Sequence, residues 1–212
     1  KHLSEAGITV DGEPSRAAAS GGARELASVS SAPLSDILAL SLKTSDNTMT
    51  EVEGRLVAVH AKQSADFAGA SKAVIAQLGK DGFDTSGLTL LDASGLAKGN
   101  KVPARLLAQI LAKAAGGEGG SAGRTLIADL PVAALDGTLT NRLHDTTAAG
   151  TVRAKTGSLE RTSSLAGVVT TADGRLLAFS ILANDFPANG GGAAAAVIDS
   201  HFVAPLASCG CS

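Results

Sequence analysis

The chain has 212 residues, of which 44% are hydrophobic and 18% charged, with a formal net charge of −2. This size allows a buried core, and a charge so near zero gives no electrostatic reason to expect nucleic acid or an anionic membrane as a partner. Five Phe are present without Tyr or Trp, so stacking on bases or sugars is not the expected mode of recognition. No uninterrupted apolar run reaches the roughly 18 residues that a membrane-spanning helix needs.

The first 30 residues are expected to hold one last helical turn, two short strands and a loop. Residues 1–7 are typical of a last helical turn, short strands are predicted at 8–10 and 25–30, and 13–24 has the composition of a loop. The sequence starts without an initiator Met or the apolar run of a signal peptide. We therefore expect a mature product or a fragment of something longer.

Helical periodicity begins after Pro33. Apolar residues three and four apart predict helices over 34–42, 49–59 and 67–78, and Ser35 is the expected N-cap of the first. The triplet Ser45-Asp46-Asn47 therefore falls at a helix-to-helix junction, where the side chains of one tight turn can converge on a cleft.

The middle of the chain is expected to alternate short elements with turns. The pattern predicts a strand at 88–91, a helix over 103–111 with Pro103 in its first turn, a flexible connection at 116–123 and a short helix at 139–143. Asp92 and Asp136 are interpreted as turn formers.

The last third predicts an antiparallel meander. Strands are expected at 151–159, 164–170 and 175–183, with a hairpin turn at Asp173-Gly174 and a closing helix over 193–202. This order predicts an α/β (α+β) fold in which helices cover both faces of a mainly antiparallel sheet.

Cys209 and Cys211 are the two cysteines of the chain. A Cys-x-Cys pair bridges itself only with strain, and two thiols without a nearby His make a poor metal site. We expect no metal here, and thiols that are free or paired with a cysteine outside this chain.

Lys155-Thr156-Gly157 lies on the first strand of the predicted meander. The Lys supplies a positive field, Thr156 and Ser158 supply hydroxyl donors, and Gly157 lets a ligand backbone approach closely. This combination suits a carboxylate. Because a tripeptide also occurs by chance, a solvated edge strand with a scattered Lys is the alternative.

Ser45-Asp46-Asn47 alone would be an ordinary helix cap. Upstream of a Lys-Thr-Gly strand, it supplies the second of the three motifs that mark serine beta-lactamases and penicillin-binding proteins. The third motif, Ser-x-x-Lys, holds the nucleophile, and no lysine of this sequence has a serine three residues before it. The nucleophile is therefore expected outside this chain.

With these motifs in place, the sequence resembles class C low-molecular-mass penicillin-binding proteins, the D-alanyl-D-alanine carboxypeptidase/endopeptidase family (peptidase family S13). The resemblance spans nearly the whole chain, through Ser31-Ala32-Pro33-Leu34-Ser35, the two motifs, Asp92-Ala93-Ser94-Gly95-Leu96, residues 130–143 and Val152–Leu159. It implies a penicillin-binding/serine beta-lactamase-like fold, incomplete here. Residues 1–212 would form its carboxyl-terminal part, with 1–30 returning from an inserted region and Ser-x-x-Lys on an amino-terminal segment of the same protein.

The resemblance also implies an activity. It is that of a serine D,D-peptidase that cleaves the terminal D-Ala-D-Ala bond of the peptidoglycan stem peptide, with endopeptidase action on cross-links as a further option. Such an enzyme forms an acyl-enzyme, is acylated by beta-lactams, acts outside the cytoplasm and uses no cofactor. This chain by itself is not expected to acylate.

The resemblance assigns roles residue by residue. Ser45 would relay a proton to the leaving amine, Asn47 would bond the substrate amide, and Lys155 would sustain the positive field. The remaining positions implied for substrate binding are Thr156, Gly157, Ser158, Leu159, Leu96, Lys98 and Glu160. Of these, Thr156 and Ser158 would hold the terminal carboxylate and the N–H of Leu159 would join the oxyanion hole.

Two departures stand out. Ser158 replaces the family's usual Thr, and Ala97-Lys98 replaces Ser-Arg, so the bidentate fork of an Arg is lost.

Two alternatives stay open. A serine beta-lactamase requires a deacylating Glu between the two motifs, and residues 61–150 offer only Glu118. A non-catalytic module with this fold is the other, against which the complete set of hydroxyls and cations argues.

Overall fold

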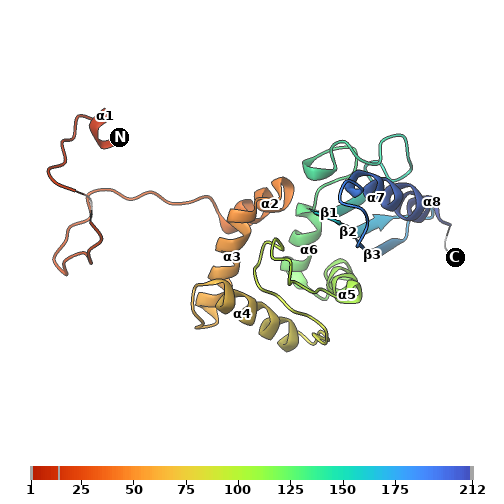
Figure 1. Ribbon diagram of the computed structural model, residues 1–212, viewed down its shortest axis with the longest axis horizontal. Coiled ribbons are helices and arrows are strands. Elements are labelled where there is room, and N and C mark those ends of the chain that lie inside the picture. The colour runs from red at the N-terminus through yellow and green to blue at the C-terminus, as the bar shows by residue number, and fades with distance from the viewer. Residues whose placement is uncertain (1, 14, 211–212) are drawn as a thin grey trace. The chain divides into compact units, whose positions relative to one another are not determined.

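The computed structural model describes residues 2–13 and 15–210, and the chain divides into two compact units, Lys1–Ser31 and Ala32–Ser212 (Figure 1). Among its described residues the first unit contains one short helix, α1 (His2–Glu5), and no strand. The strands expected at 8–10 and 25–30 are therefore wrong. Leu26 and Val29 are 84% and 97% exposed, and the described residues of this unit offer no second strand with which they could pair.

The second unit follows the predicted order of helices, an antiparallel meander and closing helices (Figure 1). The first helices are α2 (Leu34–Thr44), α3 (Asn47–His60), α4 (Phe67–Lys80), α5 (Ala104–Ala115) and α6 (Gly120–Asp129). A 3₁₀ turn, η1 (Gly137–Leu139), precedes the strands β1 (Val152–Leu159), β2 (Thr162–Thr170) and β3 (Leu176–Asn184). The last elements are α7 (Gly191–Val197), the π-helical η2 (Ile198–Val203) and α8 (Ala204–Ser208).

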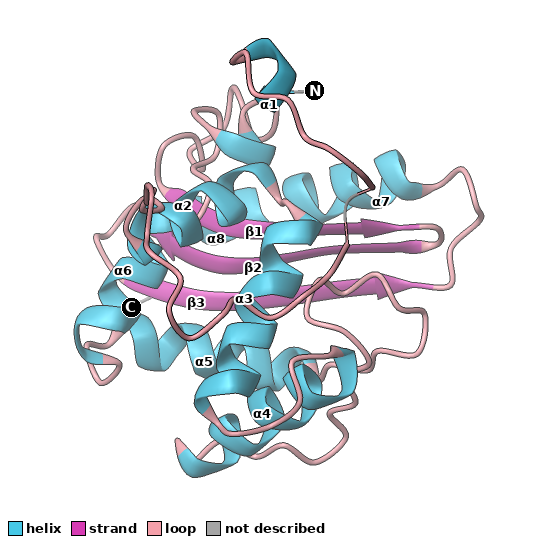
Figure 2. Ribbon diagram, turned by 90° about the vertical axis from the view of Figure 1, so that its left-hand side faces the viewer, coloured by secondary structure: helices cyan, strands magenta, loops and turns pink. Residues whose placement is uncertain are grey.

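The three strands form an antiparallel sheet in the order β1-β2-β3. Val152 lies opposite Val169, and Gly167 lies opposite Ala154 on one side and Phe179 on the other. Since side chains alternate along a strand, these residues share one face, which is buried against the closing helices through Ile198, Val203 and Ala207. Helix α5 packs on β2 and β3, and Figure 2 shows the sheet between the closing helices and the earlier ones. Helices thus cover both faces, as predicted.

Helix α6 occupies part of the stretch expected to be a flexible connection. A Cβ atom at Gly123 would lie 2.9 Å from the Cα of Ala114, so glycine lets α6 approach α5 closely. This packing orders a segment whose glycine content disfavours a helix.

Two further elements in the middle of the chain differ from expectation. The strand expected at 88–91 is reduced to a single bridge between Thr89 and Lys101. The helix expected at 139–143 is absent, and the 3₁₀ turn η1 ends at Leu139, which is fully buried. In both places tertiary contacts fix short irregular turns that apolar periodicity does not reveal.

The residues that cap two of these helices differ from expectation. The N-cap of α2 is Pro33, without a side-chain capping bond, and Ser35 Oγ instead donates to Asp36 Oδ1 at 3.1 Å. Pro103 is the N-cap of α5 rather than a first-turn residue. A missing N–H is tolerated at either position because no intrahelical partner is lost.

Cys209 is disulfide-bonded, so the expectation of a free thiol there is wrong. Cys211 lies outside the described residues. In the part of the chain that the structure describes, no helix has the length and apolar character needed to cross a membrane.

Candidate active site

Ser45-Asp46-Asn47 forms the tight turn between α2 and α3, as predicted. Ser45 has φ 56° and ψ 46°, a left-handed conformation that costs a non-glycine residue on the order of 1 kcal/mol. Asp46 Oδ1 accepts the N–H of Met49 at 2.8 Å and caps α3, whose first residue is Asn47. The turn therefore holds Ser45 and Asn47 in fixed positions between two helices.

The side chain of Lys155 reaches this turn from β1. Its Nζ donates to Ser45 Oγ at 2.7 Å and to the carbonyl oxygen of Thr156 at 3.0 Å. The two motifs, 110 residues apart in sequence, thus meet at one point of the surface. The structure brings together the two groups that the sequence places on separate elements.

Among the described residues, Lys155 is a cation without a carboxylate partner. Burial lowers the pKa of the Lys155 ammonium, and no described carboxylate forms an ion pair with it. Its described partners are a hydroxyl and a carbonyl. An unpaired, partly desolvated ammonium beside a hydroxyl donor is suited to receive an anionic group, such as a carboxylate.

Lys43 fixes the end of α2 next to the Ser45-Asp46-Asn47 turn through two hydrogen bonds. Its Nζ donates to Asp136 Oδ2 at 2.6 Å and to the carbonyl of Leu130 at 2.8 Å. Asp136 Oδ1 also accepts the N–H of Val132 at 2.7 Å, which confirms its expected role in a turn. Burial raises the pKa of Asp136, but the bonds from Lys43 and Val132 outweigh it, so the pKa lies below its usual value.

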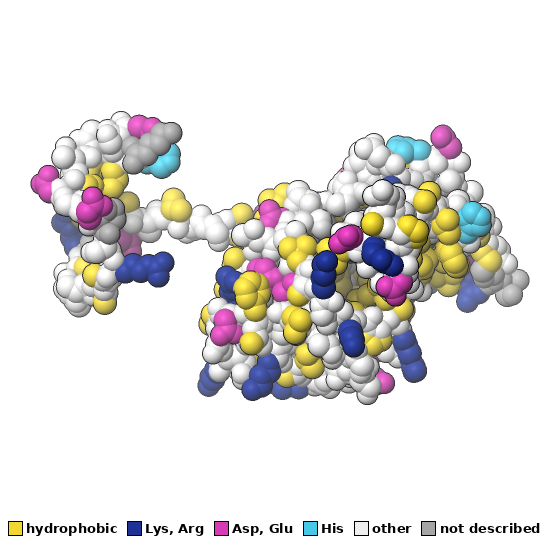
Figure 3. All heavy atoms as spheres, viewed as in Figure 1, with side chains coloured by type: hydrophobic (Ala, Val, Ile, Leu, Met, Phe, Trp, Pro, Cys, Tyr) yellow, Lys and Arg dark blue, Asp and Glu magenta, His cyan; other side chains and the backbone are white. Residues whose placement is uncertain are grey.

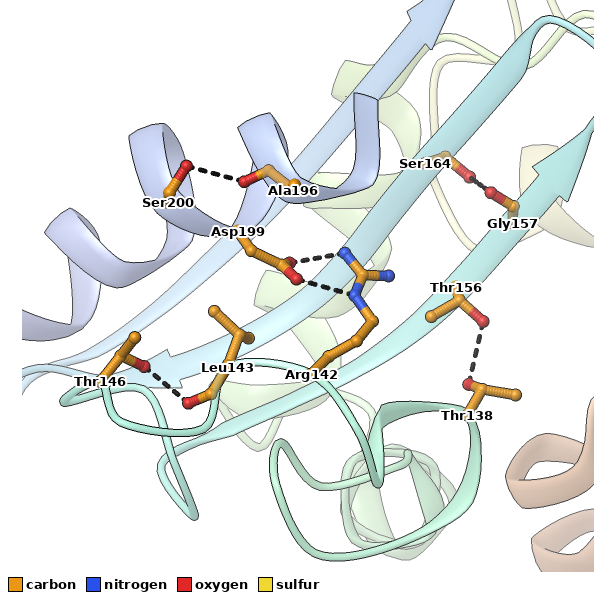
Figure 4. Close-up of polar contacts among 10 residues, drawn as sticks. All are labelled: Thr138, Arg142, Leu143, Thr146, Thr156, Gly157, Ser164, Ala196, Asp199 and Ser200. Carbon is orange, nitrogen blue, oxygen red and sulfur yellow. Dashed lines mark hydrogen bonds and ion pairs between the residues drawn. The ribbon is translucent and has the colours of Figure 1, made fainter. Parts of the chain in front are cut away.

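The residues after Lys155 are held from both sides (Figure 4). Thr156 Oγ1 donates to Thr138 Oγ1 at 2.9 Å, so this hydroxyl meets η1 rather than the ammonium of Lys155. Ser164 Oγ of β2 lies 3.5 Å from the carbonyl oxygen of Gly157. Ser158 is exposed near the end of β1. Thr138 was not predicted from the sequence, because only the tertiary fold brings η1 to β1.

The loop from Asp92 to Asn100 lines the candidate site on a second side, opposite α3. Asp92 accepts the N–H groups of Gly95 and Ala97 at 2.9 and 2.7 Å and the side-chain amide of Asn100 at 2.7 Å, as expected of a turn former. Burial raises the pKa of Asp92, but these bonds outweigh it, so the pKa lies below its usual value. The loop is therefore organised around one carboxylate.

A groove of about 530 Å³ is lined by residues of this loop and of α3. Its lining includes Asn47, Val52, Phe67 and Leu96, and the side chain of Leu96 is half exposed. Lys98 Nζ and Glu160 Oε2 lie 3.4 Å apart, joining the loop to the β1–β2 turn as an exposed ion pair. The predicted rim residues therefore lie on the loop and on the turn that follows β1.

A helical layer around an antiparallel sheet, with a Ser-Asp-Asn turn contacting a Lys-Thr-Gly strand, defines the penicillin-binding, serine beta-lactamase-like class of protein. The chain belongs to the D-Ala-D-Ala carboxypeptidase 3 (S13) family, whose match covers residues 1–202.

Individual relatives agree with this family. The chain is 43% identical over 194 residues to a carboxypeptidase DacB of Mycolicibacterium smegmatis, covering 90% of this chain and 41% of the relative. It is 38% identical over 169 residues to a D-alanyl-D-alanine carboxypeptidase of an Actinomadura species, covering 76% of this chain and 30% of the relative.

Among solved structures, the chain is similar to penicillin binding protein 4 from Haemophilus influenzae. The TM-score is 0.67 at 34% identity, over 72% of this chain and 35% of that one. The chain thus spans about two fifths or less of the length of these proteins.

Proposed function

We propose that this chain forms two walls of the active site of a serine D,D-peptidase, which removes the terminal D-Ala of peptidoglycan stem peptides. The observation that carries the proposal is the 2.7 Å contact between Lys155 Nζ and Ser45 Oγ, within a fold shared with the S13 carboxypeptidases. A half-buried cation to which no described carboxylate is paired fits the free carboxylate at the end of such a peptide.

In this proposal the nucleophile comes from a Ser-x-x-Lys segment of the same protein, amino-terminal to this chain. Two facts support it: the 212 residues contain no such motif, and the chain covers 41% of the Mycolicibacterium relative. The segment would complete the cleft beside Ser45 and Asn47.

The reaction would be acyl transfer in two steps. The nucleophilic serine attacks the carbonyl carbon of the penultimate D-Ala while the motif lysine takes its proton. Ser45 then relays a proton to the amine nitrogen of the leaving D-Ala as the peptide C–N bond breaks. Water hydrolyses the resulting ester, which returns the serine and releases the shortened peptide.

The residues of this chain would bind the substrate and assist proton transfer, and none of them would attack the carbonyl carbon. Lys155, Thr156 and Ser158 would hold the terminal carboxylate, and Asn47 would bond the substrate amide. Gly157 has no side chain, so the substrate backbone could run close to β1.

Leu96, Lys98 and Glu160 would read the peptide stem beyond the reacting bond. They lie on the Asp92–Asn100 loop and beside the β1–β2 turn, at the rim of the cleft. Cleavage of cross-links between stems would need the same site and a longer leaving group. Because the substrate belongs to the cell wall, the enzyme would act outside the cytoplasm.

The test is covalent labelling of the full-length protein that contains this chain. Incubation with a fluorescent penicillin should give a stable adduct, and a pentapeptide ending in D-Ala-D-Ala should release D-Ala. Failure of both reactions would refute the proposal. Rapid turnover of the penicillin, with no release of D-Ala, would instead identify a serine beta-lactamase.

A further inference from the structure

We infer that Glu51 is a positioning residue, which fixes the loop carrying Leu96 and Lys98 to the same helix that begins at Asn47. The inference deepens the proposed function and depends on it only for what the loop reads. The attachment of the loop to α3 stands on contacts between described residues.

Two backbone bonds carry the attachment. Glu51 Oε1 accepts the N–H of Ser94 at 2.8 Å and the N–H of Ala93 at 3.1 Å. Bonds from backbone N–H groups to a carboxylate are stronger than neutral ones. Glu51 is the described side chain of α3 that bonds to this loop, whereas Asp92 organises the loop from within.

Close packing accompanies these bonds. A Cβ atom at Gly54, one turn of α3 further on, would lie only 2.7 Å from the Cβ of Ala93. The loop therefore rests directly on the helix backbone at Gly54. Polar bonds at Glu51 and van der Waals contact at Gly54 define one position for the loop.

Glu51 also stands in register with the catalytic motif. It follows Asn47 by four residues, so the two lie on the same face of α3, about 6 Å apart along its axis. Both line the groove between α3 and the loop. A shift of the loop away from Glu51 would therefore change the distance between Leu96 and Asn47.

The orientation of Glu51 departs from that of an ordinary helix-surface glutamate. Arg55 lies four residues on, the usual spacing for an ion pair, yet within the described residues no ion pair joins the two. Arg55 lies over the ring of Phe67, 5.0 Å from its centre. Glu51 Oε2 is buried and has no hydrogen-bond partner among the described residues, so the described hydrogen bonds of this carboxylate all come from the loop.

This geometry predicts which ligands depend on Glu51. A stem peptide that extends to the rim would contact Leu96 and Lys98, so its binding requires the loop in place. A small penicillin that engages Ser45, Asn47 and Lys155 does not reach as far. Loss of Glu51 should therefore impair peptide turnover far more than acylation by penicillin.

The experiment compares Glu51→Ala with Glu53→Ala in the full-length protein. Glu53 is a matched control, because it lies on the same helix, has one buried oxygen without a described partner and bonds to Ser41 of α2 instead of the loop. Two readouts are used: hydrogen exchange of the Ala93 and Ser94 amides, and kcat and KM for a pentapeptide ending in D-Ala-D-Ala beside the benzylpenicillin acylation rate.

For Glu51→Ala we expect exchange at both amides to be about tenfold faster and kcat/KM for the pentapeptide to fall about tenfold, mainly through KM, as for loss of bonds to a charged group. Acylation by benzylpenicillin should stay within about threefold, because the core of the site is untouched. Glu51→Gln keeps Oε1 as an acceptor and should restore part of the peptide activity. In Glu53→Ala the exchange at Ala93 and Ser94 should match the unmodified protein.

Unchanged exchange in Glu51→Ala would overturn the inference, as would an equal loss of peptide turnover and acylation. If the unmodified protein neither releases D-Ala nor binds penicillin, the proposed function fails, while the exchange comparison still decides whether Glu51 holds the loop. If Glu51→Ala does not fold, Glu51→Met decides the matter, because it keeps a side chain of similar length without the acceptor oxygen: faster exchange at Ser94 supports the inference and unchanged exchange overturns it.

Discussion

The ammonium of Lys155 and the hydroxyl of Ser45 lie 2.7 Å apart, although 110 residues separate them in the sequence. Ser45 is held by a left-handed turn between two helices, and Lys155 by a strand paired along its length with β2. Neither group depends on a flexible loop for its place. Figure 3 shows one face of the second unit, on which hydrophobic and acidic side chains are mixed over α2 and α3.

Replacing Lys155 by Met should lower the rate of penicillin acylation by about 100-fold or more, since it removes the positive field while keeping an apolar stem of similar length. The rate of adduct formation with a fluorescent penicillin measures this effect. Lys80→Met, at the exposed end of α4, is the control and should react as the unmodified protein does. An acylation rate in Lys155→Met within threefold of the control contradicts the role given to Lys155.

The pH profile should report the same group. Burial lowers the pKa of Lys155, so its neutral form is reached at a lower pH than for an ordinary lysine, whose pKa is about 10.4. The charged form binds the carboxylate, and acylation should therefore decline as pH rises through this lowered pKa. In Lys155→Arg the guanidinium stays charged, so the alkaline decline should disappear or move to higher pH. An unchanged decline in that variant would assign it to another group.

The parts of the site that can be predicted from the sequence are those set by residues close to one another in the chain. The Ser-Asp-Asn turn follows from two helical periodicities that meet there, and the meander follows from alternation and a hairpin turn. Helix α6 escapes prediction because its glycine-rich start is ordered by contact with Ala114. The strand expected at 25–30 fails for the opposite reason, since the described residues of its own unit include no strand with which Val29 could pair.

The residues that hold the site in place also differ in how far they could be predicted from the sequence. The roles of Thr138 and Lys43 depend on contacts over 18 and 93 residues, which no periodicity encodes. Glu51 carries a weak local signal, because it lies one helical turn after Asn47. Its partners, Ala93 and Ser94, are 42 and 43 residues away, so only the folded chain reveals what it holds.

Two ion pairs should differ sharply in what they contribute to stability. Arg142 and Asp199 form two hydrogen bonds, at 2.9 and 2.5 Å (Figure 4), and only 18% and 16% of their side chains are exposed. Asp199→Ala leaves a largely buried guanidinium unpaired and should lower the free energy of unfolding by about 3 kcal/mol. Denaturant unfolding measures the change.

The exposed pair of Lys98 and Glu160 is the internal comparison. These side chains are 88% and 61% exposed, so Glu160→Ala should change the free energy of unfolding by no more than about 0.5 kcal/mol. Equal losses for Asp199→Ala and Glu160→Ala would show that burial does not set the strength of these pairs.

Gly167 should be intolerant of any side chain. It lies in β2 between Ala154 and Phe179, and an added Cβ atom would overlap the carbonyl oxygen of Arg153 and the Cα of Ala154. Because the obstacles are backbone atoms of the paired strand that carries Lys155, β1 would have to move. We expect Gly167→Ala to lower the free energy of unfolding by about 2 kcal/mol or more, and to slow acylation by penicillin as Lys155 is displaced.

Gly79→Ala is the matched control for this substitution. Gly79 lies in α4 with no atom within 4 Å of an added Cβ, so alanine should raise the free energy of unfolding by about 0.5–1 kcal/mol through its higher helix propensity. Denaturant midpoints of the two variants give the comparison, and the acylation rate shows whether β1 has moved. Gly167→Ala with an unchanged midpoint and rate would mean that β1 and β2 are not packed as closely as the structure places them.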